Sequence, residues 1–542
     1  MKRVLTTIFC LFAVAVTAQA QRGANNDWMT ENGDAQRTAT VKADAKINKD
    51  SVAKPGAVQL LWKLKLKNTP RGMNNLTPPA TLERLIGYRG FRMLGFVAGS
   101  DDNLFTIDTD LGRMEWEKKL NAAPSNAPST LTCPGGMTTS IIRPTVSTIV
   151  APPAGGFGPG RSNPAKSTVG EPWEGATTLA NIRPPQAPPP GPPAGAQAAP
   201  RPNQPPMGGA FGGGAQLIFA LAGDGMLHSM HLSGGQEYKP PVKFLPPGAN
   251  ANGLIIVDGK AYAVTSQSCN GVANGLWAYD FEAQKVLTWK GNVAGSAGAA
   301  FGGDGTIYLT TGEGAEGTPG TAIVAIDPKT LQTKSVYTNG RIFVSSPVVF
   351  EHKGKTLVAA ATVDGSIHLV DAANMSTALN VTPATGKGTA PSSLASWQDR
   401  DGTRWILVAH TGALPQGFSG TAAKGAILAW KLSEDGSKLL PGWASRDLVS
   451  PLTPTVINGV VIATAGGEFK SNDNNITPAM RAARSGKAVV YLLDGATGKE
   501  LWSSGTTITS FARGNALSGG MGQFYLTTYD GMLYAFGFPM EH

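Results

Sequence analysis

Residues Val489–Trp502, VVYLLDGATGKELW, predict two β-strands joined by a tight turn. The apolar residues of Val489–Leu493 suit a strand beside a core. Asp494 can accept hydrogen bonds from the backbone ahead of it, and Gly498 tolerates the positive φ that closes such a turn. Trp502 ends the second strand with a large aromatic side chain that can fasten one structural unit to the next.

The same pattern recurs along the chain. Asn103–Trp116, NLFTIDTDLGRMEW, aligns with the first stretch without a gap, so that Asp108, Gly112 and Trp116 take the places of the Asp, Gly and Trp above. Looser copies, three of which lose the Asp, begin at Met226, Leu276, Ala322, Ser366, Ala426 and Met532. Eight copies that repeat every ~45–60 residues, one insertion aside, predict a propeller or a repeat array.

The repeats predict an all-β, eight-bladed β-propeller over residues 57–542, preceded by an N-terminal arm over residues 21–56. The chain contains 68 Gly and 39 Pro, which fits many short strands with turns between them. The last repeat lacks a final strand, and Val58–Leu66 lacks a partner of its own. We expect that strand to complete the eighth blade, because ring closure removes exposed sheet edges.

A segment rich in Pro, Gly and Ala, Ala151–Gly214, interrupts the second blade. It contains too few apolar side chains to offset the entropy lost on ordering. The composition predicts a disordered or polyproline-like insertion. A docking tail for a partner domain is the functional alternative.

The first twenty residues have the features of a signal peptide. Lys2 and Arg3 precede the apolar run Val4–Val16, which is too short to span a bilayer, and Ala18–Ala20 is a small-x-small cleavage pattern. We therefore expect an exported protein, periplasmic or extracellular, with no membrane span. Cys10 lies inside the apolar run, so no lipid anchor is expected.

Charge gives no support for nucleic-acid binding. Removal of Lys2 and Arg3 lowers the formal net charge from +9 to about +7, and no cluster of Lys and Arg alternates with aromatic residues. We expect a monomer whose surplus charge aids solubility.

Two cysteines lie outside the signal peptide, Cys133 and Cys269. In an oxidising compartment an even pair suggests a disulfide, here between consecutive repeats. Two separate thiols are the alternative.

Two loops are longer than their counterparts in the other repeats, Gly412–Lys424 and Gly467–Gly486. Both stand before the third strand of a repeat, so they lie on one face of the ring. That face is the expected working surface, where a protein partner or a ligand would bind.

The opening of the chain and its repeat signature resemble the quinoprotein alcohol dehydrogenase superfamily, eight-bladed propellers built of pyrroloquinoline quinone (PQQ)-type repeats. The resemblance covers nearly all of the chain after the signal peptide, except Ala151–Gly214. The residues of the opening are Asp27, Trp28, Gly33, Asp34, Ala35, Gln36, Ile47, Asn48, Asp50, Leu61 and Trp62.

The resemblance implies a quinone and a Ca²⁺ ion on the central axis, with oxygen ligands for the metal and a carboxylate base for the alcohol. Glu313 falls where the family has an amide ligand, and would either bind Ca²⁺ or be a solvated loop residue. Arg341, Trp397 and Arg513 begin blades and are the candidate quinone-binding residues. The segment Gly340–Pro347, where the family carries its base, has no carboxylate, and the family's pair of adjacent cysteines is missing.

We assign no catalytic residue. The sequence favours a non-catalytic propeller that binds a ligand or partner on the face with the long loops. The alternative is a PQQ- and Ca²⁺-dependent alcohol dehydrogenase with altered metal ligands. A periplasmic assembly scaffold, similar to the propeller lipoprotein of outer-membrane assembly, is a third hypothesis, which the blade count and the absence of a lipid-attachment Cys oppose.

Overall fold

The computed structural model describes residues 27–87, 90–120, 129–145, 217–314, 317–386, 393–471, 473 and 475–539. The expected signal peptide and the Pro/Gly-rich insertion lie outside these residues. The chain divides into two compact units, Met1–Ile149 with Ala215–His542, and Val150–Gly214. All of the described residues belong to the first unit.

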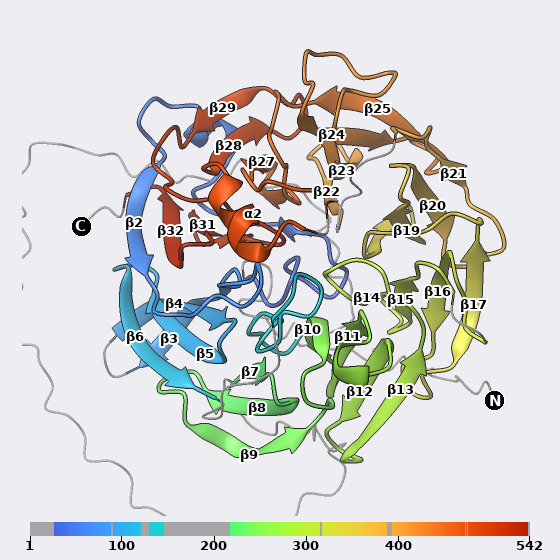
Figure 1. Cartoon of the computed structure of the whole chain (residues 1–542). Coiled ribbons are helices and arrows are strands. Elements are labelled where there is room, and N and C mark those ends of the chain that lie inside the picture. Colours follow the sequence, from blue (N-terminus) through green and yellow to red (C-terminus); the bar gives the residue numbers. More distant parts are fainter. Residues whose placement is uncertain are drawn as a thin grey trace, which may run out of the picture. The chain divides into compact units, whose positions relative to one another are not determined.

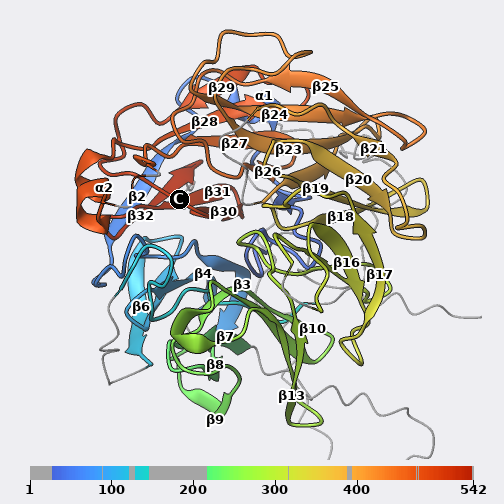
Figure 2. The ribbon, with the colours of Figure 1, turned by 45° about the vertical axis from the view of Figure 1, so that its right-hand side comes forward.

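Eight small sheets are arranged around a ring (Figures 1 and 2). The inner strands of neighbouring sheets lie side by side, for example β22 beside β26 and β26 beside β30. The eight-bladed propeller predicted from the repeats is confirmed.

The strands of blades 1 to 4 are as follows. Blade 1 contains β3 (Ala80–Gly87), β4 (Gly90–Gly99), β5 (Asn103–Asp108) and β6 (Arg113–Lys119). Blade 2 contains β7 (Leu217–Leu221), β8 (Met226–His231) and β9 (Glu237–Lys243). Blade 3 contains β10 (Asn250–Val257), β11 (Lys260–Ser266), β12 (Gly275–Asp280) and β13 (Lys285–Lys290). Blade 4 contains β14 (Ala300–Phe301), β15 (Ile307–Thr310), β16 (Ala322–Ile326) and β17 (Thr333–Thr338).

Blades 5 to 8 continue the ring. Blade 5 contains β18 (Val348–His352), β19 (Lys355–Ala361), β20 (Ile367–Asp371) and β21 (Asn380–Val381). Blade 6 contains β22 (Ala395–Gln398), β23 (Arg404–Thr411), β24 (Gly425–Leu432) and β25 (Leu439–Ala444). Blade 7 contains β26 (Thr455–Ile457), β27 (Val460–Ala465), β28 (Val489–Asp494) and β29 (Glu500–Ser503). Blade 8 contains β30 (Leu517–Gly520), β31 (Gln523–Thr527), β32 (Met532–Gly537) and, from the start of the chain, β2 (Gln59–Lys65).

The start and the end of the propeller meet in blade 8. β2 pairs antiparallel with β32, and Trp62 stands opposite Ala535. The eighth sheet therefore takes its outermost strand from the beginning of the chain.

The tryptophan of the repeat fastens one blade to the next. Trp443 donates its indole N–H to the carbonyl of Gly495, 2.9 Å away, in the turn between the third and fourth strands of blade 7. Gly498 in this turn has φ +72°, and a Cβ added there would lie 2.4 Å from the Trp443 ring. Only glycine fits both the backbone conformation and the close approach. Equivalent hydrogen bonds run from Trp62 to Thr109 and from Trp116 to Leu232.

The hydrophobic core lies between adjacent blades. Every residue of β27 and β16 is buried, and all of them except Thr464 are apolar. A strand covered on both faces needs no polar alternation.

The first part of the N-terminal arm runs inside the ring, where Figure 1 shows it in blue, and its end with the short helix α1 (Lys49–Val52) reaches β29. The arm also contains β1 (Thr40–Val41), which pairs parallel with β26. Backbone amides of six blades donate to carbonyls of the arm: Thr81 to Trp28, Arg143 to Met29, Phe301 to Ala35, Val349 to Gln36, Ser396 to Thr38 and Val456 to Ala39. Blade 3 accepts a hydrogen bond from Thr30 through Leu254 O, and blade 8 donates to Asp44 through Gly522 N. The arm thus contacts all eight blades.

Candidate functional site

One face of the ring carries the long loops. Successive strands of a blade are antiparallel, so the turns between second and third strands and the connections from one blade to the next share one end of the sheets. We call this end the loop face. Residues 412–424 and 467–486 lie on it, and the second loop contains helix α2 (Pro478–Arg484), which stands in front of the ring interior in Figure 1.

Local hydrogen bonds hold the α2 loop in place. Thr477 caps the helix by accepting from Met480 N, and Pro478 suits the first helical position. The hydroxyl of Ser485 accepts from Phe469 N at 2.9 Å and donates to Arg481 O at 2.8 Å. These contacts fix the direction in which Arg481 extends.

Arg481, Glu468 and Arg513 form an ion-pair group, which we call the axial charge cluster. Oε1 of Glu468 lies 3.1 Å from Nη2 of Arg481 and 3.0 Å from Nε of Arg513. The Glu468 side chain is 4% exposed, Arg481 is 15% exposed and Arg513 is 31% exposed. The Glu468 carboxylate is therefore the most buried group of the three, and Arg513 is the more exposed of the two arginines.

Lys470 stands at the exposed rim of this cluster. Partial loss of water around it lowers the pKa of the Lys470 ammonium, Glu468 raises it, and Arg513 and Arg481 lower it further. Desolvation likewise lowers the pKa of Arg513, Glu468 raises it and Arg481 lowers it. Three cations and one carboxylate share the site, a formal surplus of +2 (+3 − 1).

Polar contacts tie the cluster to the axis of the ring. Arg513 Nη1 donates to Asn74 Oδ1 at 3.0 Å, which joins blade 8 to the loop that leads into blade 1. Two residues later, Asn515 Nδ2 donates to Ser296 Oγ at 3.3 Å. Ser296 leads into blade 4, which is opposite blade 8 in an eight-membered ring, so this hydrogen bond crosses the axis. The rings of Phe511 and Tyr529 stack beside the cluster with their centres 4.7 Å apart.

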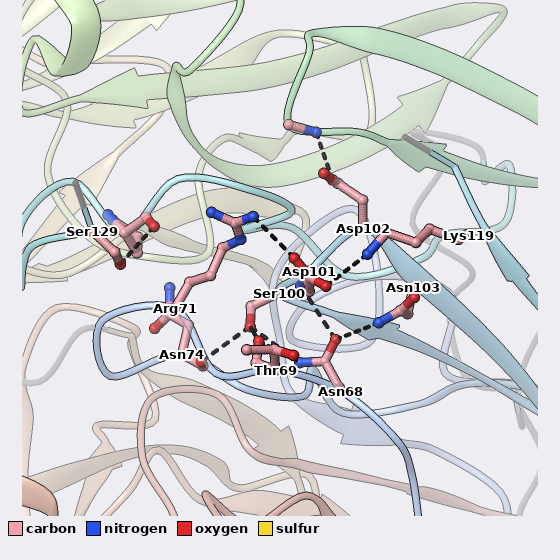
Figure 3. A network of polar contacts seen from close by, with 12 residues as sticks. Asn68, Thr69, Arg71, Asn74, Ser100, Asp101, Asp102, Asn103, Lys119 and Ser129 are labelled. Carbon is pink, nitrogen blue, oxygen red and sulfur yellow. Dashed lines mark hydrogen bonds and ion pairs between the residues drawn. The ribbon is translucent and has the colours of Figure 1, made fainter. Parts of the chain in front are cut away.

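A second polar network links blades 1 and 2 on the same face (Figure 3). Asp101 forms ion pairs with Arg71, at 2.9 Å, and with Lys119, at 2.7 Å. Burial opposes ionisation of Asp101, but these two cations outweigh it and lower its pKa. Asp102 accepts from the backbone N–H of Gly223 in blade 2 at 2.7 Å, and burial raises its pKa. Asp101 holds the loop that leads into blade 1 against that blade, and Asp102 holds blade 2 against blade 1.

A disulfide joins Cys133 and Cys269. Cys133 lies in the connection that leads into blade 2, and Cys269 begins the short 3₁₀ turn Cys269–Gly271 of blade 3. The bridge therefore joins the connection that leads into blade 2 to blade 3, on the loop face.

Two solved structures with a similar architecture are named as alcohol dehydrogenases. A quinohemoprotein alcohol dehydrogenase from Comamonas testosteroni superimposes with a TM-score of 0.55 at 13% identity, over 96% of this chain and 82% of that one. A europium-containing methanol dehydrogenase gives a TM-score of 0.54 at 12% identity, over 95% of this chain and 98% of that one. The fold is that of the quinoprotein alcohol dehydrogenases. No protein-family profile and no curated protein matches this sequence, so the likeness concerns the fold alone.

The quinoprotein alcohol dehydrogenase fold would place a metal ion and a quinone at the axis, and the residues here do not fit the metal. Glu313 is exposed, and its backbone carbonyl accepts from Asn292 Nδ2 at 2.7 Å. Among the described residues, no group of three His, Cys, Asp or Glu side chains is placed to hold a metal ion. Ca²⁺ needs several oxygen ligands, and a single exposed carboxylate does not supply them.

In the dehydrogenases the base would lie in the segment that corresponds to Gly340–Pro347. The two serines of this segment hold the backbone of neighbouring segments here. Ser345 and Ser346 are fully buried. The Ser345 hydroxyl accepts from Ala361 N at 2.8 Å, and that of Ser346 accepts from Ala297 N at 3.0 Å. Neither is a proton acceptor suited to an alcohol.

The three predicted quinone-binding residues lie at separate places. Arg341 has a side chain that is 53% exposed and forms an ion pair with Asp364. Trp397 is buried against glycines of blade 7, Gly459 and Gly495. Only Arg513 belongs to the axial charge cluster.

Sequence reasoning did not find Glu468 or Arg481. They are 13 residues apart in one loop and match no spacing rule, and only the length of that loop drew attention to the region. The described residues contain no helix with the length and hydropathy of a membrane span.

Proposed function

We propose that this protein is an exported, non-catalytic propeller that binds a ligand on its loop face. The observation that carries the proposal is the commitment of Ser345 and Ser346 to backbone hydrogen bonds at the position where the dehydrogenases carry a base. The quinoprotein alcohol dehydrogenase fold would then be a frame, and the function would belong to the loops it presents.

Two features support a binding role for the loop face. The long loops, the axial charge cluster and the disulfide are all on it. The first part of the N-terminal arm lies inside the ring and takes up hydrogen-bonding groups of the blades there, whereas the described residues of the long loops of this face are free of the arm.

The test uses the chain from residue 21 to 542 with PQQ and Ca²⁺. Binding is followed by calorimetry and alcohol oxidation by a dye-linked assay. We expect no turnover above that of free PQQ with Ca²⁺. Turnover that depends on the protein would refute the proposal.

A PQQ- and Ca²⁺-dependent alcohol dehydrogenase is the second candidate, favoured by the shared fold. It requires Glu313 as a metal ligand, so Glu313→Ala would abolish both Ca²⁺-dependent quinone binding and turnover. Under the first proposal the same substitution changes neither, because Glu313 is exposed.

Export is tested separately. Expression of the complete chain in a bacterial host with a secretion pathway should yield a product that begins at Gln21, read by N-terminal sequencing. A product that keeps residues 1–20 would contradict export by this signal.

A further inference from the structure

We propose that the axial charge cluster is a binding site for a small ligand that bears two or more carboxylate or phosphate groups. The inference rests on the proposed binding function and names the chemistry of its ligand.

The axial charge cluster carries a surplus of positive charge. A structural ion pair needs one cation for each carboxylate, whereas Arg481, Arg513 and Lys470 share Glu468. Oε1 of Glu468 lies 3.1 Å from Arg481 Nη2 and 3.0 Å from Arg513 Nε, and the same carboxylate acts on Lys470. Like charges at such short range repel one another, so the arrangement favours an added anion.

The guanidinium groups of the cluster also have unused hydrogen-bonding capacity. A guanidinium group has five N–H donors in a fork that matches carboxylate and phosphate oxygens. Within the described part of the chain, the buried Nε of Arg481 makes no hydrogen bond, whereas Nε of Arg513 lies 3.0 Å from Oε1 of Glu468. The Nε–H of Arg481 is therefore a buried donor that Glu468 leaves for a ligand.

The charged groups of the cluster lie at different depths from the surface. Glu468 is nearly inaccessible, while Arg513 is 31% exposed and Lys470 lies at the rim. An anion from solvent meets the cations first and does not face the carboxylate directly. Glu468 holds the two guanidinium groups in place, and is a positioning residue.

This layering predicts opposite effects of two substitutions. Arg513→Gln removes a ligand-facing cation and weakens anion binding. Glu468→Gln removes the internal competitor for both guanidinium groups, raises the local charge surplus and strengthens anion binding. A purely structural ion-pair group would give no such reversal of sign.

The experiment measures the binding of citrate and of inorganic pyrophosphate by calorimetry at low ionic strength, with the full chain after the signal peptide. Citrate and pyrophosphate distinguish a carboxylate from a phosphate preference. We expect Arg513→Gln to weaken binding of the preferred probe about tenfold or more, and Glu468→Gln to strengthen it several-fold. Lys470→Gln, at the exposed rim, should weaken binding without affecting the fold, and so keeps the test valid if a substitution in the buried part of the cluster unfolds the protein.

Arg113→Gln is the matched control, because Arg113 is also ion-paired, with Asp108 at 3.7 Å, but begins the outer strand of blade 1 on the opposite face. It should leave binding unchanged. Absence of binding of both probes, or equal affinities in the wild type, Arg513→Gln and Lys470→Gln, would overturn the inference. That outcome is distinct from failure of the proposed function, which would show as protein-dependent alcohol turnover.

Discussion

Replacement of Arg37 by Met should destabilise the whole propeller. Arg37 has no exposed surface. Its Nε donates to Ala299 O at 2.8 Å, Nη1 to Glu31 O at 2.6 Å and Thr30 Oγ1 at 3.0 Å, and Nη2 to Gly253 O at 2.8 Å. Methionine has a similar length but no donor, so all four acceptors would lose their partner.

The expected loss is large because the acceptors and the charge that remain are buried. The Glu31 carboxylate is fully enclosed, and burial raises its pKa while Arg37 lowers it. Burial also lowers the pKa of Arg37 to about 10, so the guanidinium stays charged at neutral pH. Arg37 acts on the Glu31 carboxylate through Coulomb attraction, without a direct ion pair. Each buried acceptor that loses its donor costs about 1–3 kcal/mol in free energy of unfolding, so the four lost hydrogen bonds dominate the effect.

The loss should depend on pH. The pKa of Glu31 is already higher in the folded than in the unfolded protein, and without Arg37 it rises further. A carboxyl group with a raised folded pKa stabilises the folded state when protonated, and this contribution is lost as pH rises through the folded pKa. The deficit of Arg37→Met should therefore be greatest at neutral pH and shrink as pH falls.

Urea unfolding followed by tryptophan fluorescence measures these effects, since the chain contains 11 tryptophans. Arg113→Met, at a side chain that is 55% exposed, is the control and should change stability by less than about 0.5 kcal/mol. Adding Glu31→Gln to Arg37→Met should recover part of the loss at neutral pH. A loss below about 1 kcal/mol at pH 7, or no relief from the second substitution, would refute the account of Arg37 as the partner of a buried charge.

Three further substitutions test the fold. Gly498→Ala should cost about 1–3 kcal/mol in urea unfolding, because the new methyl group would clash with Trp443 at a positive φ, and a neutral effect would contradict this close approach. Burial lowers the pKa of His368 to about 4, with Arg341 adding to the effect, so its contribution to stability is full above pH 6.5 and is lost as pH falls toward 4. His368→Gln should therefore flatten the acid side of the stability profile, and an unchanged profile would argue against a buried neutral imidazole. Replacement of both Cys133 and Cys269 by Ser should lower stability by about 2–5 kcal/mol; a reductant should lower the wild type equally and leave the variant unaffected.

The propeller could be predicted from sequence because its signal is local and repeated. The turn Asp, the turn Gly and the strand-ending Trp recur at fixed spacing, and each has a physical task that only a few residue types perform. In the structure, Gly498 and Trp443 meet from consecutive blades, as the repeat implied. The position of Val58–Leu66 followed from counting strands, and β2 is found beside β32.

The site could not be predicted in the same way. Glu468, Arg481 and Arg513 come from separate points of two blades, and their meeting depends on how α2 folds back over the ring. Trp397 begins a blade as expected, yet its ring packs against Gly459 and Gly495, a contact that the sequence of one blade cannot reveal. The arm shows no hydrophobic period, because its backbone and Arg37 make its contacts, and hydrogen bonds of this kind leave little trace in a sequence.

The arm has a consequence for the order of folding. Residues 28–44 precede every blade in the chain, yet their hydrogen-bond partners are distributed from Thr81 to Gly522. Contacts between residues so far apart in sequence close large loops and slow folding. The arm cannot complete its contacts until the last blade exists, so a chain that stops short of blade 8 would leave its own beginning unsatisfied. The hydrogen bond from Gly522 to Asp44 therefore makes the last blade a condition for the native arrangement of the arm.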